Sequence, residues 1–258
     1  MSGYLEHNQR RWNEVSRKKA NPYTIPISHE DYVKQKDGPI QVVLTVGKTV
    51  PEEWFERAPG KKLLGLACGG GQQGPIFASH GYDVTIMDYS QYQLEADRMV
   101  AEREGISIRT VLSDMTQTFP FEDESFDIIF CPVSNVYIEE LDTMWKESYR
   151  VLRKGGLLMV GYVNPWIYMF DDDVVWDHPD QELRLMFSLP FNSREMEEAG
   201  RVTIHPEYGY EFSHTWEEQI RGQLKQGFAM LDFYESKNPE NRLTAYANDY
   251  LANLCVKW

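Results

Sequence analysis

The chain has 258 residues and a formal net charge of −14, which argues against a surface that coats nucleic acid. Its three cysteines (Cys68, Cys131 and Cys255) are too few and too widely spaced for a disulfide framework, so we expect a reducing, cytoplasmic setting. The longest apolar run is strand-sized, and the N-terminal stretch carries charge throughout. We therefore expect neither a membrane segment, nor a signal peptide, nor a nucleic-acid partner.

The first 60 residues predict short elements without a core of their own. Residues 5–20 have the spacing of an amphipathic helix, and a second helix is expected up to about Lys36. The composition of residues 40–44 predicts a strand, and Pro51 is placed to open a turn of helix. We interpret residues 1–60 as a helical lid or brace over the rest of the chain.

The region from Lys61 to Ser90 predicts a ligand site. A buried strand over 63–66 is followed by a glycine-rich turn at 69–74, a helix to Ala78, and a second strand over 84–87 that ends on Asp88. Glycines allow backbone amides to approach a ligand closely, and the start of a helix adds a partial positive charge. An acid at the end of the second strand suits the two hydroxyls of a ribose. These features together predict a cofactor that contains a nucleoside.

Strands and helices then alternate as far as Val163. Ser90 and Gln93 form a capping-box pattern for a helix that ends at Gly105. Strands are expected over 106–112, 126–131 and 157–163, with a helix before Gly155-Gly156. This order predicts an α/β fold with a doubly wound, mostly parallel sheet, whose core spans residues 61–163.

The remaining residues, 164–258, change character. An aromatic and acidic segment without clear periodicity comes first, and we expect it to be an insertion on the substrate side. Thr215 and Glu218 then form a second capping-box pattern, for a helix to about Lys225. Residues 228–234 and 250–257 have strand composition, so this helix and two strands are expected to close the same domain.

Five stretches together resemble the class I S-adenosylmethionine-dependent methyltransferases, of the ubiquinone/menaquinone-methyltransferase type with a methyltransferase type 11 domain. The stretches are LLGLACGGG from Leu63, MDYS from Met87, SDM from Ser113, FPFEDESFDIIFCPVSN from Phe119 and YRVLRKGGLLMVGY from Tyr149. The resemblance implies a Rossmann-like sheet of seven strands with an antiparallel last strand. It also implies S-adenosyl-L-methionine as the cofactor and a small-molecule methyl acceptor.

The resemblance also implies which residues bind the cofactor. The turn amides would take its carboxylate, Asp88 its ribose, Asp114 and Met115 its adenine, and carbonyls near Pro132 its ammonium. Asp114 has the alternative of only closing a turn, and Gln93 that of serving only its capping box. The cofactor-binding residues expected in this way are Ala67, Cys68, Gly69, Gly71, Asp88, Tyr89, Gln93, Asp114, Met115 and Pro132.

Two residues depart from the pattern of this family. Gly65 stands where the family usually has an acid that helps to arrange the methionine end of the cofactor, and Ala67 stands where it usually has a glycine. The missing acid leaves open a protein that binds the cofactor without catalysis. The literal G-x-G-x-x-G spacing from Gly69 leaves open a nicotinamide-dependent oxidoreductase.

No catalytic residue or metal site is predicted. Transfer of a methyl group from a sulfonium requires mainly that the reacting atoms be held in line, and a base is needed only if the acceptor must lose a proton. His214, which precedes the second capping box, is expected to have a structural or surface role.

Overall fold

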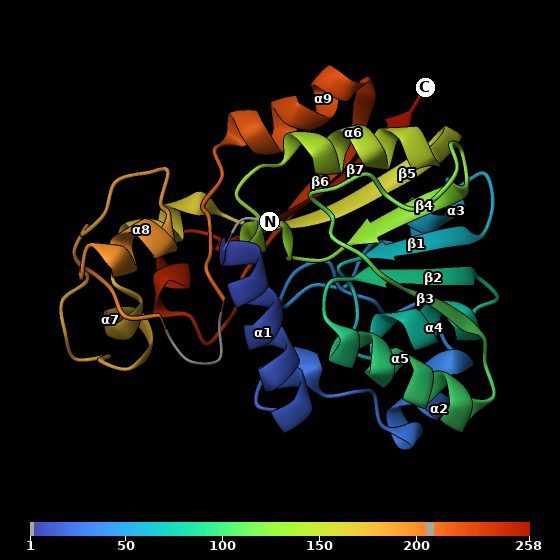
Figure 1. The fold of residues 1–258 in the computed structure, drawn as a ribbon, viewed down its shortest axis with the longest axis horizontal. Helices are drawn as coiled ribbons and strands as arrows, with labels where there is room; N and C mark the ends of the chain where they lie inside the picture. The colour runs from blue at the N-terminus through green and yellow to red at the C-terminus, as the bar shows by residue number, and fades with distance from the viewer. Residues whose placement is uncertain (1–2, 205–208) are drawn as a thin grey trace.

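The computed structural model describes residues 3–204 and 209–258 and is built on one seven-stranded sheet (Figure 1). The strand order is β3-β2-β1-β4-β5-β7-β6. β1 to β5 run parallel, whereas β7 is antiparallel to both of its neighbours. The predicted fold class is therefore confirmed. The strands are β1 Lys62–Leu66, β2 Asp83–Asp88, β3 Ile108–Leu112, β4 Phe126–Cys131, β5 Leu152–Val163, β6 Phe228–Ser236 and β7 Tyr250–Lys257.

Helices cover both faces of the sheet, because side chains alternate along each strand. On β1, Leu64 packs in the same apolar cluster as Trp145 of α6, and its neighbour Leu63 packs in a second cluster with Phe77 of α4. In Figure 1, α6 lies beside α9, and α4 beside α5. The helices are α1 Gly3–Lys18, α2 His29–Lys36, α3 Glu52–Glu56, α4 Gln73–Ser79, α5 Gln91–Glu104, α6 Asp142–Val151, α7 Asp172–Trp176, α8 Ser193–Glu198 and α9 Gly222–Gln226.

The predicted helix signals differ in outcome. The Thr215 box is complete, since the Glu218 carboxylate accepts from the Thr215 amide at 2.7 Å and the Thr215 hydroxyl accepts from the Glu218 amide at 3.2 Å. At α5, the Ser90 hydroxyl accepts from the Gln93 amide at 3.3 Å. The Gln93 side chain, however, does not return to the cap and points instead toward the glycine turn.

Two predictions about local structure are wrong. Residues 40–44 do not form a strand, although Val42 and Leu44 are buried. Their backbone bonds elsewhere: the Gln73 side chain accepts from the Val43 amide and donates to the Val43 carbonyl, both at 2.8 Å. The apolar composition reflected burial rather than strand pairing.

Gly155-Gly156 also lies elsewhere than predicted. α6 ends at Val151 and β5 begins at Leu152, so both glycines lie within the strand. Gly155 has a φ of 79°, and the pairing of β4 with β5 shifts register between Phe126 and Ile128. The glycines therefore accommodate an irregularity in β5 instead of ending a helix.

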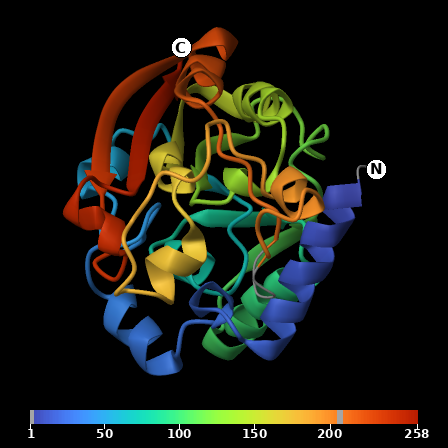
Figure 2. The same cartoon turned by 90° about the vertical axis from the view of Figure 1, so that its left-hand side faces the viewer.

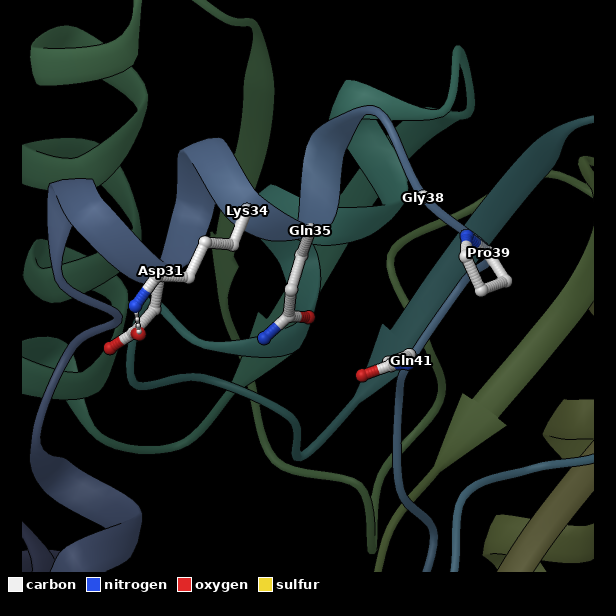
Figure 3. A pocket seen from close by; sticks show the side chains of 6 residues that line it. All are labelled: Asp31, Lys34, Gln35, Gly38, Pro39 and Gln41. Carbon is white, nitrogen blue, oxygen red and sulfur yellow. Dashed lines mark ion pairs between the residues drawn. The ribbon is translucent and has the colours of Figure 1, made fainter.

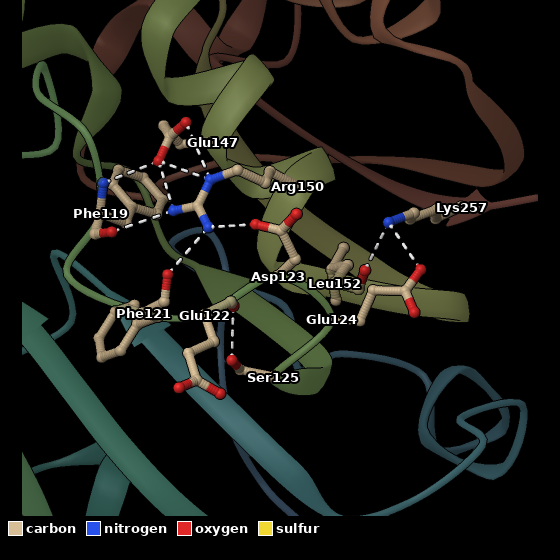
Figure 4. Close-up of polar contacts among 10 residues, drawn as sticks. All are labelled: Phe119, Phe121, Glu122, Asp123, Glu124, Ser125, Glu147, Arg150, Leu152 and Lys257. Carbon is tan, nitrogen blue, oxygen red and sulfur yellow. Dashed lines mark hydrogen bonds and ion pairs between the residues drawn. The ribbon is translucent and has the colours of Figure 1, made fainter.

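The amino ends of the parallel strands form one edge of the sheet, which we call the amino edge. An arginine organises the link that leads into β4 there (Figure 4). Arg150 bonds the carboxylate of Glu147 at 2.6 Å and that of Asp123 at 2.8 Å, and it donates to the carbonyls of Phe119 and Phe121. In the described ranges, no helix is both long and apolar enough to cross a membrane.

The opposite edge, where the parallel strands end, is the carboxyl edge. α1 and the segment after β5, with α7 and α8, lie across it in both views (Figures 1 and 2). Asn8 of α1 donates to the carbonyls of Tyr137 and Tyr210, and Gln9 donates to that of Tyr89, at 2.9 to 3.0 Å. The division of the chain into a lid, a core and a closing part stays a prediction.

Candidate functional site

The turn after β1 has backbone conformations that favour glycine. Gly70 and Gly71 have φ values of 118° and 68°, in the left-handed region. A Cβ atom at Gly70 would lie 2.8 Å from the carbonyl oxygen of Tyr23, so the chain passes too close for a side chain there. Ala67 also has a positive φ, of 46°, at the position where the resemblance noted a missing glycine.

Asp88 lies directly against this turn. Its Oδ2 accepts from the Gly69 amide at 3.0 Å and its Oδ1 from the Ser90 amide at 2.8 Å. Burial raises the pKa of the Asp88 carboxyl, and the backbone amides partly oppose that rise. The fold thus joins the predicted acid to the predicted turn.

Gln93 contacts the same turn from α5. Its Nε2 lies 3.4 Å from the Gly69 carbonyl oxygen and 3.5 Å from that of Tyr23. Its Oε1 is buried and has no hydrogen-bond partner among the described residues. Buried polar atoms normally have partners, so this oxygen is suited to a donor from a ligand.

The predicted adenine-binding residues follow β3. The Oδ1 of Asp114 accepts from the Thr116 amide at 2.8 Å, so Asp114 does close a turn, as its structural alternative proposed. Met115 is buried in the apolar cluster that contains Leu64. Burial, followed by the charges of Asp114 and Glu6, raises the pKa of Tyr89.

The cysteines and Pro132 occupy the ends of β1 and β4. Cys68 and Cys131 are free, buried thiols, and burial raises the pKa of both, to about 12 for Cys131. The carbonyl of Pro132 accepts from the Ser134 hydroxyl at 2.8 Å, so it already has one partner within the chain.

Sequence reasoning missed Asp97 of α5. Its side chain is fully buried, and its Oδ2 accepts from the Gly70 amide at 3.1 Å. Burial raises the pKa of Asp97 to about 8. The signal in the sequence was an acid between Leu94 and Val100 on the apolar side of the helix.

A second polar cluster lies on the side where the acceptor was expected. The Tyr168 hydroxyl donates to the Glu211 carboxylate at 2.7 Å. Glu211 keeps some exposed surface, but its carboxylate is deeply placed, and burial raises its pKa to about 7. His214 is buried beside the Asn135 carbonyl at 3.1 Å, and burial lowers the pKa of its ring, as suits a neutral structural histidine.

Two surface pockets lie away from these residues. One is formed by α2 and the loop after it (Figure 3), and its lining residues are Asp31, Lys34, Gln35, Gly38, Pro39 and Gln41. The other lies between α1 and α8 and includes His7 and Arg194. Neither pocket includes a predicted cofactor residue, so the candidate site remains the carboxyl edge around the glycine turn.

One known protein resembles the chain over its whole length, and a second resembles 58% of it. It is 38% identical to the uncharacterized methyltransferase YbaJ of Bacillus subtilis, and the match covers 100% of both chains. It is 29% identical over 164 residues to a sterol 24-C-methyltransferase of Gibberella zeae, of which it covers only 41%. These relatives give the nicotinamide alternative no support.

Solved structures share the fold. The magnesium protoporphyrin IX methyltransferase of Synechocystis, with S-adenosylhomocysteine bound, superimposes with a TM-score of 0.62 at 11% identity, covering 99% of this chain and 100% of that one. A putative S-adenosylmethionine-dependent methyltransferase from Listeria monocytogenes gives 0.61 at 18% identity, covering 80% and 95%. The family model of the methyltransferase domain matches residues 64–160, which contain the glycine turn, Asp88 and Asp97. The chain therefore belongs to the class I S-adenosylmethionine-dependent methyltransferases.

Proposed function

We propose that this methyltransferase holds S-adenosylmethionine at the carboxyl edge and transfers its methyl group to a small-molecule acceptor in the cytoplasm. The hydrogen bond between Asp88 and the Gly69 amide carries the proposal, because it joins the acid of β2 to the glycine turn. Asp88 would hold the ribose, Asp114 and Met115 the adenine, and the turn at Cys68 to Gly71 the carboxylate of the cofactor.

The residues present fit this cofactor. The buried Oε1 of Gln93 is available to a donor beside the turn. A Cβ atom at Gly69 would lie 2.9 Å from Asp88 Oδ2, so the missing side chain keeps the acid and the turn in contact. Asp88 and Asp114 also place negative charge around a ligand that carries a sulfonium and an ammonium.

The chemistry asks little of the protein beyond alignment. The cofactor, when bound, supplies a methyl group already activated on a positively charged sulfur. The chain's own residues would fix the ligand and the acceptor in line, and well-aligned groups gain up to about 7–11 kcal/mol in favourable cases. α1 and the segment after β5 would exclude water from this edge.

The acceptor would bind between α1 and the segment after β5. Tyr168 and Phe191 stack there with ring centroids 5.7 Å apart, and Trp12 of α1 meets Tyr137 edge to face. Glu211 accepts a hydrogen bond from Tyr168 in the same place. A carboxylate with a pKa of about 7 suits a group that takes a proton from an acceptor hydroxyl or amine near neutral pH.

Melting curves test the cofactor site. At a hundred times its dissociation constant a ligand adds about 2.7 kcal/mol, or about 5–10 °C in melting temperature at this chain length. We expect this rise with S-adenosylhomocysteine and no rise with NAD or NADP at equal concentration. A shift with NAD alone would overturn the proposed site.

A screen of small acceptors, scored by release of S-adenosylhomocysteine, tests the acceptor side. Once an acceptor is found, Glu211→Gln should lower turnover while leaving cofactor affinity unchanged. Glu182→Gln, at an exposed ion pair with Arg184, is the control and should leave both unchanged. Turnover only with protein or RNA acceptors would contradict the small-molecule proposal.

A further inference from the structure

Position 65 has no room for a side chain. A Cβ atom on Gly65 would lie 2.5 Å from Cδ1 of Ile86 and 3.2 Å from Cβ of Cys68. Gly65 is on β1, and Ile86 is its partner on β2. Apolar atoms therefore fill the space in which an acid on β1 would have to stand.

Asp97 brings a carboxylate to the same turn from α5. Its Oδ2 accepts from the Gly70 amide at 3.1 Å, and its Oδ1 lies 3.1 Å from the Cβ position of Gly74. Cδ1 of Ile86, which fills the space beside Gly65, also lies 3.1 Å from that Cβ position. Asp97 and Ile86 therefore both lie against Gly74. The acid is thus next to the space that β1 leaves without one.

The burial of Asp97 is not explained by the fold alone. The residue has 0% exposure, and its Oδ1 has no hydrogen-bond partner among the described residues. The Gly70 amide already donates a hydrogen bond to the Gln93 carbonyl at 3.1 Å, so it would keep an acceptor without Asp97. Burying a carboxylate with an unpartnered oxygen is costly, and an apolar residue would pack this side of α5 more favourably.

The charges around Asp97 increase that cost. Burial has the largest effect on the pKa of Asp97 and raises it. The like charge of Asp88, at the end of β2, raises it further. Arg98 of the same helix and the amides of Gly70 and Gly71 act in the opposite direction. Asp88 and Asp97 thus hold two consecutive amides of the turn, those of Gly69 and Gly70, from two different elements.

We propose that Asp97 is a positioning residue, which holds the Gly70-Gly71 turn in the shape that receives the amino-acid end of S-adenosylmethionine. Asp97 holds this turn from α5, and it thereby takes the place of an acid at position 65 of β1. This inference rests on the proposed cofactor site. It predicts that the Asp97 oxygen matters for cofactor affinity beyond its contribution to folding.

Calorimetric titration with S-adenosylhomocysteine tests the proposal in four proteins: the parent, Asp97→Ala, Asp97→Asn and Asp127→Ala. Asp127 is the matched control, because it is also a buried acid that accepts from a backbone amide, that of Lys62 at 2.9 Å. It lies at the amino edge, at the start of β4. Melting temperatures are measured on the same samples.

We expect Asp97→Ala to weaken binding at least tenfold and Asp97→Asn to restore it to within threefold of the parent, since an amide oxygen can still accept from Gly70. Asp127→Ala should lower the melting temperature but keep the parent affinity. If the alanine variant does not fold, Asp97→Ser, which is too short to reach Gly70, replaces it. Parent-like affinity in a folded Asp97→Ala or Asp97→Ser variant would overturn the inference. Failure of the parent itself to bind would instead overturn the proposed site.

Discussion

Two buried acids near the amino edge of the sheet, Glu147 and Asp127, are paired with arginines, whereas the half-buried Asp88 and the buried Asp97 at the carboxyl edge are held by backbone amides. Glu147 bonds Arg150 at 2.6 Å, and Asp127 bonds Arg153 at 3.0 Å. At the carboxyl edge, Asp88 and Asp97 accept from Gly69 and Gly70. Within residues 3–204 and 209–258, neither of these two acids takes part in an ion pair with a lysine or arginine.

The contrast shows how one sheet separates stability from binding. A paired carboxylate has its charge satisfied within the protein, which fixes the link into β4 but leaves nothing for a ligand. An acid held only by amides has no counter-charge within the protein, so burial raises its pKa. Such an acid lowers the stability of the fold as the pH rises and it ionises. A cationic cofactor is the natural complement to such an edge.

Breaking the amino edge should give the largest change in stability. Arg150→Ala removes the arginine partner of the buried Glu147 carboxylate. It also removes the hydrogen-bond donor of the Phe119 and Phe121 carbonyls. Loss of one partner of a buried pair costs about 3–5 kcal/mol. We expect a correspondingly lower free energy of unfolding in urea, with S-adenosylhomocysteine affinity unchanged. The control Arg184→Ala, at an ion pair exposed on both sides, should differ from the parent by less than about 0.5 kcal/mol.

Breaking the carboxyl edge should instead affect binding. Asp88→Ala removes a carboxylate that would make charge-assisted bonds to a ribose, each worth about 1.5–3 kcal/mol. We expect S-adenosylhomocysteine to bind at least about tenfold more weakly, measured by calorimetry. Stability should fall less than in Arg150→Ala, because the groups that lose a partner, among them the Gly69 and Ser90 amides, are uncharged backbone groups. An affinity within twofold of the parent would remove Asp88 from the site.

The same contrast explains how far the sequence could predict the molecule. The sheet and its helices were predictable because apolar periodicity, caps and glycines act locally, as at Ser90 and Gly105. Asp88 and the glycine turn were predictable because they stand where parallel strands end. The strand predicted over residues 40–44 was wrong, because burial and strand pairing favour the same residue types.

Other features needed the fold. Asp97 follows Asp88 by nine positions on a helix that seemed merely charged, and only the packing of α5 shows its carboxylate at Gly70. Tyr168 and Glu211 are 43 residues apart, and no local pattern predicts that they meet. α1 is tied to this edge by Asn8 and Gln9, whose partners are backbone carbonyls of any residue type.

The two edges should also respond to pH with opposite signs. Because the pKa of Asp97 is about 8 in the folded state, against an ordinary value of 3.8, its contribution to stability is lost as pH rises between these values. For Glu147 burial raises the pKa, but the hydrogen bonds from Arg150 and the Phe119 amide outweigh it and leave the pKa below 4.5. Its contribution is therefore present above that value and is lost in acid.

Urea unfolding across pH 3 to 9 measures both signs, as on the order of 1.4 kcal/mol per pH unit at most for one group. Relative to the parent, Asp97→Asn should gain stability as pH rises from about 4 to 8. Glu147→Gln should lose stability, relative to the parent, as the pH rises in the acid range up to the ordinary value of 4.5. Equal slopes in all three proteins would mean that the two edges do not differ in this way.

The smallest change in stability should come from relieving backbone strain. At each edge we consider one residue other than glycine that has a positive φ. Ala67, with a φ of 46°, begins the turn at the carboxyl edge, and Glu124, with a φ of 55°, lies in the exposed link at the amino edge. Glycine relieves about 1–2 kcal/mol at such a position, but its greater freedom in the unfolded chain takes back about 0.4–1 kcal/mol. Ala67→Gly also loses a methyl that packs against the core, and Glu124→Gly loses a weak contact with Lys257 at 3.5 Å. We therefore expect both variants to melt within about 4 °C of the parent.

Only Ala67→Gly should change the affinity for S-adenosylhomocysteine, by about twofold to threefold, because only there does the freed backbone continue into Gly69 and Gly70. An equal loss of affinity in Glu124→Gly would show that binding depends on the stability of the whole sheet rather than on the shape of its carboxyl edge.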